Sequence, residues 1–155
     1  MKKTVAFLLA LVLALGLVGC GTQHDSIYED DAELAASDKY SVSLYNGLSI
    51  EEGYYDFSAG TISGTRTIWR LHAQEGEAEV TLGYTLTEEN GGSVKLILVS
   101  PDDTITTLAE ASAAQESGTH SFEPTAGTWR LKIVGKGEAK MRAHLEYNAG
   151  EIGTD

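Results

Sequence analysis

The side chains best suited to chemistry include three histidines, His72, His120 and His144. Ser and Asp residues surround them in the sequence, and a Ser-His-Asp site needs only that such residues meet in space. The chain has no Gly-x-Ser-x-Gly turn to present a nucleophilic serine, and alternation places His72 and His144 on polar strand faces. We therefore interpret these histidines as solvated surface residues and predict no catalytic residue.

A pair of carboxylates, Glu77 and Glu79, offers a second kind of chemistry. Two residues apart in a strand, they would be separated by about 6–7 Å, within the range of carboxylate pairs that hydrolyse glycosidic bonds. Arg70 and His72 should lie nearly opposite them across a turn at residues 74–76. Cross-strand ion pairs therefore explain the two glutamates more simply than catalysis does.

Asp102 and Asp103 follow Pro101 and could supply part of a calcium site, which needs several oxygen ligands. Pro-Asp-Asp-Thr is also ordinary type I turn chemistry, and the ligand spacing of an EF-hand is absent. The chain has one Cys and four scattered His, so the spacing typical of a zinc site is missing too. We predict no metal and no cofactor. An enzyme would require two or three of Asp102, His72, His120 and the Glu77–Glu79 pair to converge in one pocket.

Two groups of side chains are candidates for ligand binding. Alternation turns Tyr55 and Phe57 inward and leaves Tyr54 exposed, where its ring could stack on a sugar. Outward-facing bases also occur on the last two predicted strands, and a hairpin of these strands would gather four of them into one basic patch: Arg130, Lys132, Lys140 and Arg142. Such a patch could receive a carboxylate-bearing glycan or an acidic partner. The alternative is that nearby glutamates, Glu123, Glu138 and Glu146, merely balance these charges.

The elements that must position these residues are strands, because apolar and polar residues alternate with a period of two. The clearest runs lie at residues 65–73, 77–86, 94–99, 129–133 and 139–147, with weaker ones at 41–45, 53–58, 104–109 and 119–122. Turn residues separate them, and residues 110–118 are predicted to form a loop. Ile97 and Val99 make the second face of their strand apolar, which predicts either a central strand covered on both sides or a face that meets a partner. Eight or nine short strands predict an all-β, antiparallel, jelly-roll-like β-sandwich at residues 41–148, with a flexible tail at 149–155.

Two stretches of this domain carry a family resemblance. Residues 92–109, GSVKLILVSPDDTITTLA, and 118–135, GTHSFEPTAGTWRLKIVG, resemble the closing half of small jelly-roll modules of secreted bacterial proteins. Those modules are the carbohydrate-binding-like and pre-peptidase C-terminal-like β-sandwiches. The resemblance implies a turn at Gly127, a core position for Trp129 and an accessory role in binding, adhesion or stabilisation.

The first residues have the layout of an export signal. Lys2 and Lys3 precede an apolar run at residues 5–18, which is shorter than the ~20 residues that span a bilayer. The following Leu17-Val18-Gly19-Cys20 resembles the lipobox of bacterial lipoproteins. The resemblance implies cleavage after residue 19 and lipid, including palmitate, on Cys20. We expect residues 1–19 to be a signal peptide and the mature protein to be anchored in the cell membrane through Cys20, facing the extracytoplasmic side.

Charge separates the rest of the chain into a tether and a domain. Removing residues 1–19 takes two of the 11 basic residues and none of the 23 acidic ones, which changes the formal charge from −12 to −14. Such a balance excludes nucleic acid as a partner. Residues 20–40 are polar and acidic, and we predict a disordered tether that lifts the domain off the membrane. We expect a non-catalytic module that binds a protein at the cell envelope, or alternatively a carbohydrate- or cell-wall-binding module.

Overall fold

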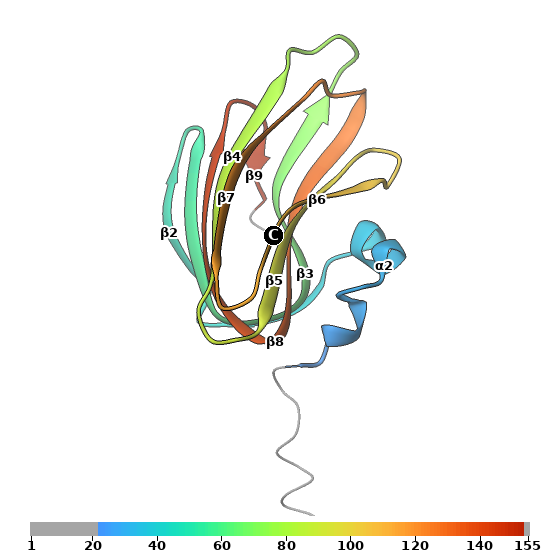
Figure 1. Ribbon diagram of the computed structural model, residues 1–155. Helices are drawn as coiled ribbons and strands as arrows, with labels where there is room; N and C mark the ends of the chain where they lie inside the picture. Colours follow the sequence, from blue (N-terminus) through green and yellow to red (C-terminus); the bar gives the residue numbers. More distant parts are fainter. Residues whose placement is uncertain (1–21, 154–155) are drawn as a thin grey trace, which may run out of the picture.

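The computed structural model describes residues 22–153, so the predicted signal peptide and Cys20 lie outside the described part of the chain. A short 3-10 helix and one α-helix come first, and nine strands follow (Figure 1). In chain order these are η1 (Asp25–Ile27), α2 (Asp31–Ala36), β1 (Lys39–Ser43), β2 (Asn46–Glu51), β3 (Tyr54–Ala73), β4 (Val80–Glu88), β5 (Ser93–Val99), β6 (Ile105–Ala111), β7 (Gln115–Phe122), β8 (Gly127–Tyr147) and β9 (Glu151–Ile152). Within these residues no helix is long and apolar enough to cross a bilayer.

Two long strands organise the molecule. β3 has 20 residues and β8 has 21, and they pair antiparallel along almost their whole length. The first half of β8 also pairs with β5, and the second half with β4. One layer therefore has the order β6-β5-β8-β3, with β1 and β9 also paired to β3, and the other has the order β7-β4-β8-β3-β2. We call them the helix-side layer and the open layer.

The long strands pass from one layer to the other where their pairing register breaks, between Ala59 and Gly64 of β3. Gly64 has φ +93°, and a Cβ there would lie 2.0 Å from the Lys39 carbonyl oxygen. A Cβ at Gly135 of β8, its register partner, would lie 2.5 Å from Ile62. Only glycine permits this close approach of backbones, so the bend is encoded in these two positions. The result confirms the predicted all-β antiparallel sandwich.

The core fills the space between the two layers. Its largest fully buried members come from β3, β4, β5 and β8: Phe57, Ile68, Trp69, Leu82, Leu86, Leu98, Leu131 and Ile133. The indole Nε1 of Trp69 donates a 2.9 Å hydrogen bond to the carbonyl of Ala149. The predicted flexible tail is wrong for residues 149–153, since β9 pairs with Trp69 and Arg70, and the Gly153 amide donates to Ile68.

The acidic N-terminal segment is packed against the domain, which corrects the prediction of a disordered tether for residues 22–38. Ile27, Tyr28 and Leu34 are buried against a second apolar cluster on the outer face of the helix-side layer, formed by Ile97, Val99 and Val134. The apolar second face of β5 therefore belongs to a strand covered on both sides, and the cover is this chain's own helix. The segment's few apolar residues suffice because they share one compact site on the sheet.

Three further expectations about the strands differ from the structure. β3 and β4 do not form a hairpin, because β3 ends in the helix-side layer and β4 begins in the open layer. Residues 110–118 are mostly strand, with β6 ending at Ala111 and β7 beginning at Gln115. The last two predicted strands are one bent strand, β8, because Gly135 to Gly137 continue the chain instead of reversing it.

Candidate binding groove

The outer face of the open layer carries side chains from five strands in register. One row across the sheet reads Glu51, Tyr54, Glu146, Gly83 and Thr119, and the next reads Ser49, Asp56, His144, Thr85 and Ser117. All of these face away from the core because Tyr55, Phe57, Leu82 and Leu145 alternate with them and are buried. This face is therefore polar throughout, with ionisable groups on β2, β3 and β8 and hydroxyl groups on β4 and β7.

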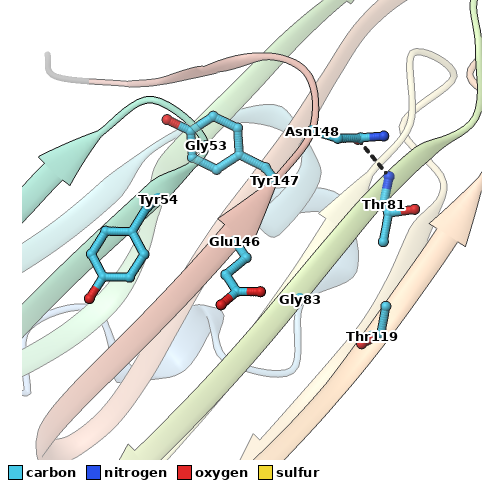
Figure 2. Close-up of a pocket in the computed structure, with 8 residues that line it drawn as sticks. All are labelled: Gly53, Tyr54, Thr81, Gly83, Thr119, Glu146, Tyr147 and Asn148. Atoms are coloured by element: carbon cyan, nitrogen blue, oxygen red, sulfur yellow. Dashed lines mark hydrogen bonds between the residues drawn. The ribbon is translucent and has the colours of Figure 1, made fainter.

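Three adjoining hollows of about 430, 360 and 200 Å³ follow this face along β8. The first is lined by Tyr54, Tyr147 and Asn148, among others, and is shown in Figure 2. It shares Gly83 and Glu146 with the second, and the second shares its Thr85 and His144 walls with the third, which ends at Arg142. Together they form one shallow, open groove, which we call the sheet groove.

Gly83 makes the floor of the sheet groove low. It stands on β4 between Thr81 and Thr85, and a Cβ built there would lie 3.4 Å from both Cβ and Oε2 of Glu146. The φ of Gly83 lies outside the left-handed region, so the backbone would accept a side chain. Neither the backbone nor these contacts exclude a side chain at residue 83, and glycine leaves the space above it open to the groove.

Aromatic rings border the first hollow. Figure 2 shows Tyr54 and Tyr147 at one end of it, with the ring of Tyr147 beside Gly53 and Glu146 between Tyr54 and β4. Tyr147 lines this hollow and is also partly buried against the core. Tyr54 meets the ring of His144 edge to face, at 4.7 Å between centroids and 69° between planes. Its hydroxyl donates to the Asp56 carboxylate, which raises the pKa of Tyr54 and lowers that of Asp56.

His144 joins the two carboxylates of the face. Its Nδ1 lies 2.8 Å from Asp56 Oδ1, and its Nε2 lies 3.2 Å from Glu146 Oε1. Burial lowers the pKa of His144, but the hydrogen bonds and charges of Asp56 and Glu146 outweigh burial and raise it above 6.5. Tyr54, Asp56, His144 and Glu146 thus form a continuous hydrogen-bonded chain along one wall of the sheet groove.

The opposite wall is built from hydroxyl and amide groups. Thr81 and Ser121 share a hydrogen bond of 2.9 Å between their hydroxyls, and the Thr81 amide donates to Asn148 Oδ1 at 2.9 Å (Figure 2). Asn148 Nδ2 donates to the carbonyl of Glu79 at 3.2 Å, which holds its side chain in place. This wall offers neutral donors and acceptors in fixed positions.

The structure separates the candidate residues that the sequence grouped together. Tyr54 faces outward, as alternation predicted, and it lines the sheet groove. The prediction of one basic patch is wrong, because β8 is a single bent strand whose first half, with Arg130 and Lys132, lies in the helix-side layer and whose second half, with Lys140 and Arg142, lies in the open layer. Lys140 and Arg142 both pair with Glu89, at 2.8 and 3.0 Å.

The other two bases hold the helical segment in place. Lys132 is buried, and its Nζ donates to the carbonyls of Leu34 and Ser37 at 2.6 and 3.0 Å. Arg130 donates to the carbonyl of Ala35 at 2.8 Å and pairs with Asp103 at 2.6 Å. Cations at the C-terminal carbonyls of α2 complement the helix dipole, so the role of both residues is structural.

The residues considered for catalysis or metal binding do not meet. His72 contacts Thr128, His120 stacks on Phe122, and Glu77 and Glu79 lie in the exposed connection between β3 and β4. The expected ion pairing of these glutamates with Arg70 and His72 is wrong, since no β3–β4 hairpin forms. Asp102 is hydrogen-bonded by Ser100. Within residues 22–153 no three His, Cys, Asp or Glu side chains are grouped as a metal site would require.

Sequence reasoning missed Asp56, Glu146, Asn148 and Gly83 as groove residues. Alternation did place His144 on a polar face, but nothing in it indicated contact with Asp56, which lies 88 residues earlier. The signal that could have suggested the groove is the run of small or hydroxyl residues on one face of β4, Thr81-x-Gly83-x-Thr85-x-Thr87, opposite four apolar or aromatic residues.

Comparisons with known proteins give distant likenesses only. No family model and no curated protein matches the chain. Among solved structures it is similar to a CBM4 protein, with 11% identity, a TM-score of 0.40 and coverage of 75% of this chain and 81% of that one. It is also similar to BiXyn10A CBM1, with 13% identity, a TM-score of 0.41 and coverage of 75% of this chain and 94% of that one. A cupin domain from Bordetella pertussis has 13% identity to it, with a TM-score of 0.35 and coverage of 73% of this chain and 100% of that one. At such identities and TM-scores these likenesses do not indicate what this chain binds.

Proposed function

We propose that the protein is a non-catalytic glycan-binding module, and that the sheet groove is its binding site. The observation that carries this proposal is a long, open groove in which hydroxyl, amide and carboxylate groups lie beside aromatic residues, with Tyr54 and Tyr147 at one end. A sugar chain presents hydroxyl groups along its length and apolar C–H faces that pack on aromatic rings. Fixed amide, hydroxyl and carboxylate groups beside tyrosines match both properties.

The shape of the groove favours a linear glycan over other ligands. Sites for compact small molecules enclose most of the ligand's surface and are mainly apolar, whereas these hollows are shallow and open. Protein interfaces have an apolar centre that excludes water. The large hydrophobic side chains exposed among the described residues are Leu44 and Ile50, and neither lines the groove. The sequence favoured protein binding, with glycan binding as the alternative. The polar lining of the groove favours the glycan-binding alternative instead.

Filling the groove tests this proposal. Gly83→Val would place a β-branched side chain beside Glu146 without straining the backbone, and Thr107→Val would place valine on an exposed position of β6, outside the groove. Residues 22–155 contain every described element, so this chain can be assayed by pull-down with insoluble polysaccharides and by affinity electrophoresis in soluble ones. We expect Gly83→Val to weaken retention at least about tenfold, equivalent to about 1.4 kcal/mol, and Thr107→Val to bind like wild type.

The assay has a clear negative outcome. If the wild-type chain is retained by no polysaccharide or wall fraction, the proposed function is wrong. If Gly83→Val and Thr107→Val both bind like wild type, glycan binding occurs elsewhere and the sheet groove is not the site. Tyr54→Ala should lower retention by a smaller factor, about three- to tenfold, since one aromatic contact contributes about 0.5–1.5 kcal/mol.

We also propose that this module is held at the extracytoplasmic side of the cell membrane by lipid on Cys20. The leader and its lipobox-like ending support the anchor. Packing against the domain begins at His24, whose amide donates to Ser63, so only residues 21–23 separate it from Cys20. Four residue steps span at most about 14 Å, so the domain would lie directly at the membrane without a stalk.

The strand directions set how the groove would lie on such an anchor. The chain enters beside the bend of β8, where the Asp25 carboxylate accepts from the Gly137 amide at 2.9 Å. The sheet groove follows β8 from Arg142 to Tyr147, and the Tyr54 end lies about 30 Å along the strand from this bend.

We expect Cys20→Ser to abolish membrane fractionation and to leave uncleaved precursor. A processed, membrane-bound Cys20→Ser protein would contradict the anchor and leave glycan binding unaffected.

A further inference from the structure

The hydrogen-bonded chain on the β3–β8 wall presents one carboxylate oxygen to the sheet groove. Asp56 is engaged at both oxygens, by Tyr54 and by His144. Glu146 contacts His144 through Oε1, and its Oε2 makes no hydrogen bond to another described residue. That oxygen lies above Gly83, where a Cβ would come within 3.4 Å of it. Glu146 therefore offers a free acceptor at the centre of the first hollow (Figure 2).

The charge around this oxygen is negative. Asp56 and Glu146 share His144 between them, and Glu51 occupies the same row on the neighbouring strand, next to Tyr54. When His144 is protonated, its single positive charge is shared between Asp56 and Glu146. The next groove-lining cation on β8, Arg142, lies in the third hollow at the far end and is bound to Glu89, which also binds Lys140. The chain as a whole has a formal charge of −12. A ligand unit at the Tyr54 end thus meets more negative than positive charge.

We propose that the Tyr54 end of the sheet groove binds a sugar unit that carries a free amino group, with its ammonium on Glu146 Oε2 and its C–H face against Tyr54. This deepens the proposed glycan-binding function and rests on it. A hydroxyl group can donate to the same oxygen, but a charged donor gives the stronger hydrogen bond. A uronate would place a carboxylate against Glu146 and Asp56 and is disfavoured at the same place. The groove therefore ranks glycans by charge in the order amino, neutral, acidic.

Oligosaccharides with one linkage and different charge separate these classes. The probes are β-1,4-linked hexamers of glucosamine, N-acetylglucosamine, glucose and glucuronate, titrated calorimetrically into residues 22–155 at low and at moderate salt. We expect glucosamine to bind about two- to fivefold more tightly than the neutral hexamers, the range of an exposed ion pair, and to lose this advantage as salt rises. Glucuronate should bind most weakly and improve with salt.

Two matched variants identify the carboxylate responsible. Glu146→Gln keeps the shape of the side chain and removes its charge, so the advantage of glucosamine over the neutral hexamers should disappear and the penalty on glucuronate should shrink. Glu138→Gln removes one charge from an exposed position outside the groove and should preserve the ranking. Glucuronate binding as tightly as glucosamine, or a ranking that Glu146→Gln leaves unchanged, would overturn this inference and leave glycan binding intact. Failure of every hexamer to bind, together with failure on polysaccharides, would instead remove the proposed function itself.

Discussion

Lys132 should be the side chain that keeps the N-terminal helix on the sandwich. Its ammonium is enclosed, with 1% of the side chain exposed, and it donates to the carbonyls of Leu34 and Ser37 and pairs with Asp38 at 3.1 Å. Lys132→Met keeps the length and packing of the side chain but removes the donor. The perturbation therefore isolates the electrostatic part of the docking.

The magnitude follows from what the substitution leaves behind. Two carbonyl oxygens lose their donor, at about 1–3 kcal/mol for each one that stays buried. Asp38 is 28% exposed and also accepts from Thr67, so it can be solvated, and loss of its ion pair adds less than about 1 kcal/mol. Methionine avoids the cost of desolvating an ammonium, which offsets part of the loss. We expect the free energy of unfolding to fall by about 2–4 kcal/mol.

Urea denaturation of residues 22–155 measures this change, and hydrogen exchange locates it. Amides of α2 should exchange faster in Lys132→Met, and an apolar dye should bind the face that Ile97 and Val134 expose when the helix leaves. Lys39→Met is the matched control, because Lys39 contacts the same helix through Glu33 at 2.6 Å but both side chains are exposed. It should cost less than about 1 kcal/mol. The reasoning is refuted if the two variants are equally stable, or if Lys132→Met leaves exchange in α2 unchanged.

Three further predictions concern stability. Burial raises the pKa of the Glu88 carboxyl, but hydrogen bonds from four backbone amides outweigh burial and hold this pKa below 4.5. The stability that Glu88 contributes should therefore be present above pH 4.5 and be lost as the pH falls through the folded-state pKa. Glu88→Gln should flatten the plot of urea midpoint against pH in this acidic range. The pKa of His144 is raised above 6.5, so its stabilisation should be full below that pH and lost as pH rises through the folded-state value. His144→Asn should therefore narrow the difference in urea midpoint between about pH 5.5 and about pH 8.5, and an unchanged difference would contradict the ion pairs with Asp56 and Glu146. Gly64→Ala and Gly91→Ala both place alanine at positive φ. Of these two positions only Gly64 has a backbone atom, the Lys39 carbonyl oxygen, where the new Cβ would lie. The melting temperature of Gly64→Ala should therefore fall clearly further than that of Gly91→Ala.

Local patterning in the sequence was sufficient to predict which way side chains point. Period-two alternation placed Tyr55 and Phe57 in the core and Tyr54, His144 and Lys140 outside, and the structure agrees. It also identified β5 as apolar on both faces. These predictions succeed because alternation depends only on the geometry of one strand.

Pairing between distant segments could not be predicted in the same way. The wall of the sheet groove depends on the register of Tyr54 with Glu146, which lies 92 positions later in the sequence and is decided by how β3 and β8 bend together. The glycines at residues 135 and 137 resemble a hairpin turn in sequence, yet Gly135 is needed for close approach to Ile62. The acidic segment lacked a sustained apolar period, but burying Tyr28 and Leu34 on a preformed sheet face does not require one.

The two outer faces of the sandwich differ in polarity and in whether the chain covers them. The helix-side layer has Ile97, Val99 and Val134 on its outer face, and the chain covers them with its own N-terminal segment, because exposed apolar surface is costly in water. The open layer carries hydroxyl groups, carboxylates and a histidine on its outer face and has no cover among the described residues. A face that is stable in water needs no protein partner to bury it. What such a face can still do is exchange its water for ligand hydroxyl and amino groups held in the same hydrogen-bonding positions, and this favours a glycan for the sheet groove.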